Sequence, residues 1–140
     1  GKWPEIDLNK NQQFTSLQEA LDFYGVTEIE VPQWMPSGFT QEKVTVEPNG
    51  VWLTFSVEYM SNNGDALIVV DYNSYNSIPT NYYEKLVESP QSFIINKTKY
   101  NIVNNSTNST VAWTTPHFEC FISVPMDDIE VLRRIISSIQ

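Results

Sequence analysis

The sequence predicts a single α+β domain, in which an antiparallel meander of about six to seven strands carries one N-terminal and one C-terminal helix. Apolar residues recur at helical spacing near both ends of the chain. Between these segments, short stretches of alternating apolar and polar residues are separated by polar turns, which favours an antiparallel sheet. The 140 residues, 41% of them hydrophobic, suit one domain with a buried core.

The first helix is expected at residues 16–24. Residues 1–13 are polar and are interpreted as a linker or N-terminal arm, which leaves 14–140 as the folded domain. Ser16 and Glu19 fit a capping box, in which each side chain satisfies a backbone N–H of the first helical turn. Gly25 suits the helix end because glycine adopts the left-handed conformation at no steric cost.

The stretch WMPSGF at 34–39 raises a choice between a ligand-gripping loop and a corner that leads into a strand. Pro36 fixes one turn torsion and Gly38 permits positive φ, so we predict the corner. Alternation and apolar runs then predict seven strands, at 43–47, 51–59, 66–70, 92–95, 100–103, 110–114 and 118–124. The segment 71–91 is rich in Asn, Ser and Tyr and is expected to be an irregular crossover with one helical turn near 82–87.

A second helix closes the chain. Asp127 is the expected N-cap, and Arg133 and Arg134 lie towards the C-terminal end, where cations complement the helix dipole. The predicted buried stripe consists of Ile129, Leu132, Ile135, Ile136 and Ile139.

The charged and reactive residues argue against several function classes. Seventeen acidic residues against eight basic ones give a net charge of −9, which disfavours nucleic acid and anionic membrane surfaces as partners. The chain has one histidine and one cysteine, without the spacing of a metal site. His117 and Cys120 are expected on opposite sides of a strand, as a surface histidine and a core cysteine. We therefore predict no catalytic, metal-binding or cofactor-binding residue, and no cofactor; an enzyme is the least favoured class.

Aromatic residues are the remaining candidates for binding. Trp34, Trp52, Tyr72 and Tyr75 form a candidate contact surface for a sugar or a peptide. The alternative, which aromatic burial favours, places most of the aromatic side chains in the core or against the sheet. Strand alternation puts Trp52 opposite the expected buried face, so it is a candidate for exposure.

Five motifs, in this order, resemble a family of uncharacterised bacterial domains found in membrane-anchored proteins of the anti-sigma-factor and sporulation type. They are Ser16–Leu21, the corner Met35–Phe39, the hairpin Ile95–Tyr100, the Ala112–Trp113 pair and the closing helix of 124–139. Lys97 stands where that family has glycine. The resemblance implies no catalytic residues.

The leading hypothesis is a non-enzymatic sensory or interaction domain of a membrane-anchored regulator, similar to an anti-sigma factor. The resemblance implies a location outside the cytoplasm, with membrane contact only through an anchor that lies outside this sequence. The partner is expected to be a protein or a cell-envelope ligand. The alternative is a secreted accessory module that binds cell-wall material or carbohydrate through exposed aromatic side chains.

Overall fold

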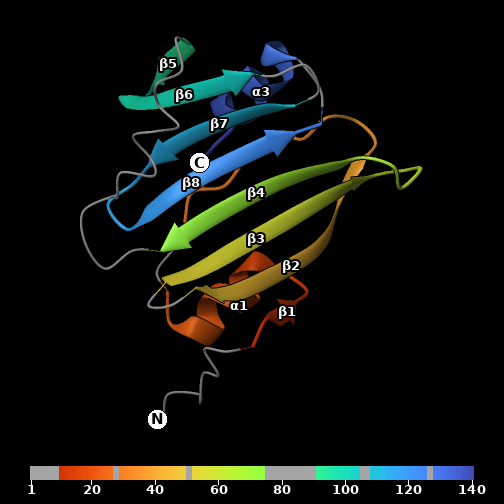
Figure 1. Cartoon of the computed structure of the whole chain (residues 1–140), viewed down its shortest axis with the longest axis vertical. Coiled ribbons are helices and arrows are strands. Elements are labelled where there is room, and N and C mark those ends of the chain that lie inside the picture. Colours follow the sequence, from red (N-terminus) through yellow and green to blue (C-terminus); the bar gives the residue numbers. More distant parts are fainter. Residues whose placement is uncertain (1–9, 27–28, 50–51, 75–90, 105–107, 126–127) are drawn as a thin grey trace.

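The computed structural model describes residues 10–26, 29–49, 52–74, 91–104, 108–125 and 128–140. In these ranges the chain forms an eight-stranded sheet with two helices, so the predicted α+β class is confirmed. Figure 1 shows both helices behind the sheet, α1 behind β2 and β3, and α3 behind β6 and β7. The helices are α1 (Leu17–Tyr24) and α3 (Ile129–Ser137). The strands are β1 (Gln12–Phe14), β2 (Phe39–Asn49), β3 (Trp52–Ser61), β4 (Leu67–Ser74), β5 (Gln91–Ile95), β6 (Thr98–Asn104), β7 (Ser109–Thr114) and β8 (Phe118–Val124).

The sheet consists of two antiparallel four-stranded meanders joined at β4 and β8. The strand order is β1-β2-β3-β4-β8-β7-β6-β5, so β5 forms the far edge and does not lie next to β4. The predicted antiparallel meander is thus confirmed in outline, with its order broken once between β4 and β5, whereas the expected count of six to seven strands was wrong. The additional strand is β1, in which Gln12, Gln13 and Phe14 pair with β2, although Gln12 and Gln13 were expected in the N-terminal arm.

Two strands are longer in the structure than the apolar patterns predicted. β2 begins at Phe39, directly after the corner, and its register shifts between Gln41 and Lys43. β4 continues through Asp71 to Ser74, so the first four residues of the expected crossover are strand. The rest of that crossover, 75–90, and the predicted helical turn at 82–87 lie outside the described residues.

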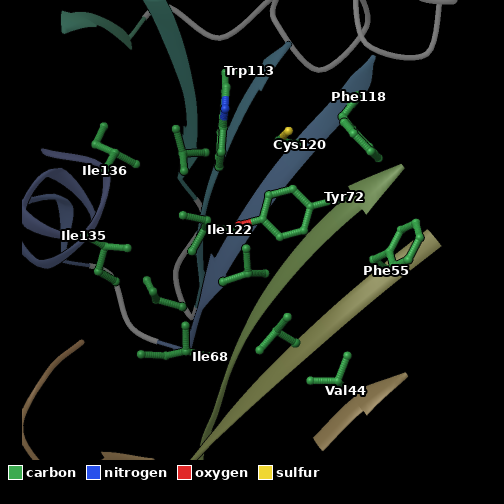
Figure 2. Close-up of a cluster of buried hydrophobic side chains, with 14 of the residues drawn as sticks. Val44, Phe55, Ile68, Tyr72, Trp113, Phe118, Cys120, Ile122, Ile135 and Ile136 are labelled. Carbon is green, nitrogen blue, oxygen red and sulfur yellow. The ribbon is translucent and has the colours of Figure 1, made fainter. Parts of the chain in front are cut away.

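Cross-strand register builds the core on the face that the helices cover. Most apolar residues on this face lie opposite another, as in a half-buried antiparallel sheet, whereas Phe118 lies opposite Ser74 and Val124 opposite Ser109. One such row across the sheet contains Val44, Val57, Val70, Ile122, Val111 and Ile102. The row beside it contains Val46, Phe55, Tyr72, Cys120 and Trp113. Figure 2 shows members of both rows together with Ile135 and Ile136 of α3.

The helix ends largely follow the predicted caps. The Ser16 hydroxyl accepts a 3.1 Å hydrogen bond from the N–H of Glu19, and Gly25 ends α1 with φ of 67°. The reciprocal half of the capping box is replaced, because the Glu19 carboxylate accepts from the Thr15 hydroxyl instead. Asp128 caps α3, where the sequence suggested Asp127, which lies outside the described residues.

Two turns require unusual backbone conformations. The predicted hairpin between β5 and β6 is confirmed, and both turn residues, Asn96 and Lys97, have positive φ. Gly38 has φ of 90° at the corner that leads into β2. The corner interpretation is thus confirmed for residues 36–39, because the N–H of Phe39 donates to the carbonyl of Pro36 and Phe39 is the first residue of β2.

Candidate functional site

The candidate contact residues do not form one exposed surface among the described residues. Tyr72 is 1% exposed and belongs to the core, so its predicted place on a contact surface was wrong. Trp34 is half-buried, and the guanidinium of Arg134 lies 4.3 Å from the centre of its ring. The side chain of Trp52 and all of Tyr75 lie outside the described part of the chain.

The two most reactive side chains lie in different environments. His117 is exposed in the turn between β7 and β8, whereas Cys120 is fully buried. Burial, with a smaller contribution from Glu119, raises the pKa of the Cys120 thiol far above its usual value. Within the described ranges, no three His, Cys, Asp or Glu side chains come together in a way that could hold a metal ion.

The sheet is wider than its two helices. Eight strands about 4.8 Å apart span roughly 34 Å, whereas a helix with its side chains is only about 10 Å across. α1 packs against β1, β2 and β3, and α3 packs against β7. The centre of the covered face is therefore left to an irregular segment, residues 29–34, which we call the strap.

A cleft of about 720 Å³ lies where α1, the strap and the central strands meet. Its floor is formed by Val57 and Tyr59 of β3 and by Val70 and Tyr72 of β4. These four residues point to the same side because they occupy alternate positions on two paired strands. Val57, Val70 and Tyr72 are buried, so the floor belongs to the hydrophobic core, and Tyr59 is its half-buried member.

The side walls come from opposite ends of the chain. Leu17, Gln18 and Leu21 of α1 form one wall, because positions one and four residues apart share a face of the helix. Residues 29–31 of the strap form the other wall, together with Gln140. The cleft has the size of a small-molecule site and, like such sites, combines an apolar interior with a few polar groups.

Backbone hydrogen bonds hold the strap to the segment that follows α3. Val31 and Gln140 exchange two N–H to carbonyl hydrogen bonds of 2.9 and 3.0 Å. The N–H of Gln33 donates to the carbonyl and the hydroxyl of Ser138, and the N–H of Trp34 donates to the same hydroxyl. The wall of the cleft and the end of α3 are therefore one hydrogen-bonded unit.

The polar side chains of the cleft offer both donors and acceptors. The side-chain Nε2 of Gln18 donates to Asp22, and that of Gln41 donates to the carbonyl of Thr15. Each of these amides keeps its carbonyl oxygen and its second N–H without a hydrogen bond to any described residue. Glu30, an exposed residue, also lines the cleft.

Two tyrosine hydroxyls lie at the floor. The Tyr72 hydroxyl donates a long, 3.4 Å hydrogen bond to the carbonyl of Glu30, which links β4 to the strap. The Tyr59 hydroxyl makes no hydrogen bond to any described residue. Burial raises the pKa of both tyrosines, so both hydroxyls are neutral at physiological pH and can donate or accept.

A shallower groove runs along the outer side of α3. It holds about 460 Å³ and is lined by Trp34, Val131 and the side chains of neighbouring polar residues on the helix. The guanidinium of Arg134 covers the ring of Trp34, and that of Arg133 lies 4.0 Å from the ring centre of Phe93. These cation–π contacts fix the strap and β5 against α3.

Comparisons of the chain with protein-family models, with curated proteins and with solved structures find no match. Neither described helix has the length and apolar character needed to cross a membrane. Of the cleft residues, sequence analysis named only Tyr72 as a candidate, and for a surface role. Gln18, Glu30, Gln41 and Tyr59 carry no local motif, so nothing in the linear pattern pointed to them.

Proposed function

We propose that this chain is a non-enzymatic sensory domain that binds a small ligand in the cleft between α1 and the strap. The observation that carries the proposal is the cleft itself, whose 720 Å³ volume falls within the range of small-molecule sites. Its half-buried apolar side chains supply affinity because a ligand can bury them further, and its few polar groups supply orientation; these apolar side chains are those of Leu17, Ile29, Val31 and Tyr59. The described lining has tyrosines, glutamines and one glutamate, and it has no histidine, cysteine, serine or lysine to act as a nucleophile or as a base near neutral pH.

The strap gives such a domain a means of reporting occupancy. A ligand that contacts Val31 and Gln140 also contacts the hydrogen-bonded pair that joins the strap to the end of α3. Binding that favours one arrangement of this pair shifts the population of the whole unit. The exposed side of α3, with its groove beside Trp34, is then the surface whose shape depends on the ligand.

The setting of this sensor follows from the sequence resemblance and remains part of the proposal. In that setting the domain lies outside the cytoplasm, is tethered to the cell membrane by an upstream anchor, and controls a protein partner in the manner of an anti-sigma factor. The net charge of −9 agrees with a partner other than nucleic acid.

The competing idea of a carbohydrate-binding aromatic face receives less support. Such a face requires rings that are open for stacking, and Tyr72 is buried while Arg134 covers the ring of Trp34. We therefore favour the cleft over the aromatic side chains as the binding site.

A fragment screen by ligand-observed NMR tests the proposal, with two matched variants. Leu17→Trp places an indole in the cleft, whereas Ile129→Trp makes the same kind of change at the first residue of α3, outside the cleft. Both positions are half-buried aliphatic residues at a helix start. We expect bound fragments to be lost with Leu17→Trp and kept with Ile129→Trp. A screen without any binder, or binding that survives Leu17→Trp, would contradict the proposal.

A further inference from the structure

The two edges of the sheet differ in how they are protected. β1 forms one edge; it has only three residues, and α1 packs against it. β5 forms the other edge and pairs with β6 alone (Figure 1). Edge strands of natural proteins are usually kept very short, charged or interrupted by proline, which prevents further pairing. The five residues of β5 include no charged side chain and no proline, so this edge lacks these protections.

The unused pairing groups of β5 belong to Ser92 and Ile94. The β5–β6 turn has two residues, so the residues that flank it, Ile95 and Thr98, exchange both of their backbone hydrogen bonds. Such pairs alternate along an antiparallel ladder, so Ser92 and Ile94 direct their N–H and carbonyl groups away from β6. Neither residue forms a hydrogen bond with described residues outside the β5–β6 pair. An extended peptide is the ligand that satisfies donors and acceptors spaced in this way.

The side chains beside this edge differ between the two faces of the sheet. Ile94 is 75% exposed, the largest exposed fraction among the large hydrophobic side chains that the structure describes. Lys99 lies opposite Ile94 on the same face. On the other face, the guanidinium of Arg133 lies 4.0 Å from the ring centre of Phe93. An added strand would therefore meet an aliphatic side chain on one face and a guanidinium on the other.

The charge at this edge is opposite in sign to that of the whole molecule. The hairpin of 91–104 contains Lys97 and Lys99 and no acidic residue. Neither lysine forms an ion pair within the described part of the chain. Arg133 has a long, 3.8 Å contact with Glu130, and its side chain is 48% exposed, so it has donors left for a second carboxylate. Complementary charge at this edge therefore favours an acidic partner.

We propose that β5 binds an extended acidic segment of a protein partner, which adds a strand to the sheet. The aliphatic residues of that segment lie beside Ile94, and acidic residues alternate with them and lie beside Arg133. A second copy of this chain fits less well, because it would bring the same basic side chains to both sides of the junction and join two molecules of net charge −9. This edge shares no residue with the described lining of the cleft, so strand addition requires no ligand there.

Four peptides of equal length test the proposal in isothermal titration calorimetry. They are acetyl-EVEVEVE-amide, acetyl-KVKVKVK-amide, and two forms of the acidic peptide with N-methyl groups, on its three valines or on three of its glutamates. The valine N–H groups face β5 when valine lies beside Ile94, and the glutamate N–H groups face away. We expect the acidic peptide to bind at least about 10-fold more tightly than the basic one, since several partly exposed charge pairs differ. Methylation of the valines should abolish binding, and methylation of the glutamates should preserve it.

Hydrogen exchange by NMR locates the bound peptide on β5. We expect the acidic peptide, at saturation, to slow amide exchange of Ser92 and Ile94 by at least about 10-fold, because these N–H groups gain partners. The N–H groups of Phe93 and Ile95 already face β6, so their exchange should change much less.

Two variants, each with a matched control, identify the side chains involved. Ile94→Asp removes the aliphatic contact and adds a repelling charge, and should weaken the acidic peptide at least about 10-fold; Leu67→Asp makes a similar change at an exposed residue of β4 and should not. Arg133→Gln should weaken the acidic peptide about 2- to 5-fold, the effect of one partly exposed charge pair, and Lys43→Gln in β2 should not.

Several outcomes would overturn the assignment and leave the proposed function standing. They are no binding of the acidic peptide, equal binding of the basic or the valine-methylated peptide, and equal effects of Ile94→Asp and Leu67→Asp. A peptide-free dimer that Ile94→Asp converts to a monomer in sedimentation would show that a second copy occupies the edge. Fragment binding that survives Leu17→Trp would contradict the cleft alone and leave the assignment of β5 intact.

Discussion

Replacing Ser138 by alanine removes the hydroxyl that joins the strap to α3. This hydroxyl accepts hydrogen bonds from the N–H groups of Gln33 and Trp34, at 3.0 and 3.1 Å, and donates to the carbonyl of Ile135 at 2.6 Å. No other hydrogen bond of the Trp34 N–H occurs within the described residues, whereas the N–H of Gln33 keeps the backbone carbonyl of Ser138 at 3.2 Å. The substitution thus leaves one half-buried donor of the strap without a partner.

The expected loss follows from these three bonds. A protein hydrogen bond contributes about 0.5–1.5 kcal/mol net, and the retained Gln33 contact reduces the effective number lost to two, so we expect a loss of about 2 kcal/mol. For a domain of this length, that corresponds to a fall in Tm of roughly 6–8 °C. If the loss is local to the strap, amide exchange of Val31 and Gln140 should accelerate by about 30-fold.

Urea unfolding and hydrogen exchange by NMR measure the two quantities. Ser137→Ala is the control, because Ser137 is the neighbouring serine, is exposed on α3, and has a hydroxyl that forms no hydrogen bond with described residues. It should leave both the free energy of unfolding and the strap exchange near the wild-type values. If Ser138→Ala and Ser137→Ala behave alike, the hydroxyl does not hold the strap, and the proposed coupling between cleft and helix loses its basis.

Three further predictions concern single residues. Lys97 has φ of 69° in the β5–β6 turn, so Lys97→Gly should stabilise the protein by about 1 kcal/mol in urea unfolding, whereas Lys99→Gly in β6 should destabilise it. Burial raises the pKa of Asp71, the hydrogen bond from Ser56 opposes this, and the negative charges of two neighbouring glutamates add to it. Because the pKa of Asp71 is higher in the folded state, its protonated form stabilises the fold at a pH below the unfolded-state pKa, and this stabilisation is lost as pH rises through the folded-state pKa. At pH 7, Asp71→Asn should therefore have a higher free energy of unfolding than the wild type, and the difference should disappear near pH 3. Cys120 should not react with a thiol reagent in the native protein and should react fully in guanidinium chloride; rapid native labelling would place it outside the core.

The parts of the fold that sequence predicted are those set by local chemistry. Ser16 and Gly25 marked the ends of α1 because a cap depends on residues within one helical turn. The alternation around Phe55 and Val57 identified both the strand and its buried face. The turn around Gly64 was equally local, with the N–H of Gly64 donating to the carbonyl of Ser61.

The parts that sequence missed depend on distant partners. β1 has no apolar alternation in Gln12 and Gln13, and it is a strand because the backbone of β2 pairs with it. Asp71 and Asn73 gave β4 a polar end, yet the strand continues there because Tyr72, between them, points into the core and the polar neighbours point to the other face. The pairing of β4 with β8 joins residues about fifty positions apart, which no local pattern encodes.

The candidate site could not be predicted from the sequence either, because its residues come from distant parts of the chain. One stretch is an exception. The cleft is assembled from α1, the strap, three strands and Gln140, each of which has an ordinary sequence. The exception is the stretch at 34–39, for which the corner was predicted over the ligand-gripping loop. The structure divides that stretch: Pro36 to Phe39 form the corner, and residues up to Trp34 form the strap.

This division has a physical cause in the corner itself. Gly38 adopts φ of 90°, which fixes the direction in which the chain enters β2 and therefore where the preceding residues must lie.

A Cβ at that position would meet the side chain of Asn62 at 3.6 Å, an ordinary contact, so Gly38→Ala should act through backbone strain alone. We expect Gly38→Ala to lower the free energy of unfolding by about 1 kcal/mol. We also expect faster amide exchange of Val31, because the strap directly precedes the corner in the chain. Gly64→Ala, at φ of 78° in the β3–β4 turn, has the same kind of backbone cost in a turn that does not lead from the strap. If both variants are equally destabilised and neither changes exchange at Val31, the corner and the strap are independent, and occupancy of the cleft would have to be transmitted through Ser138 and Gln140 alone.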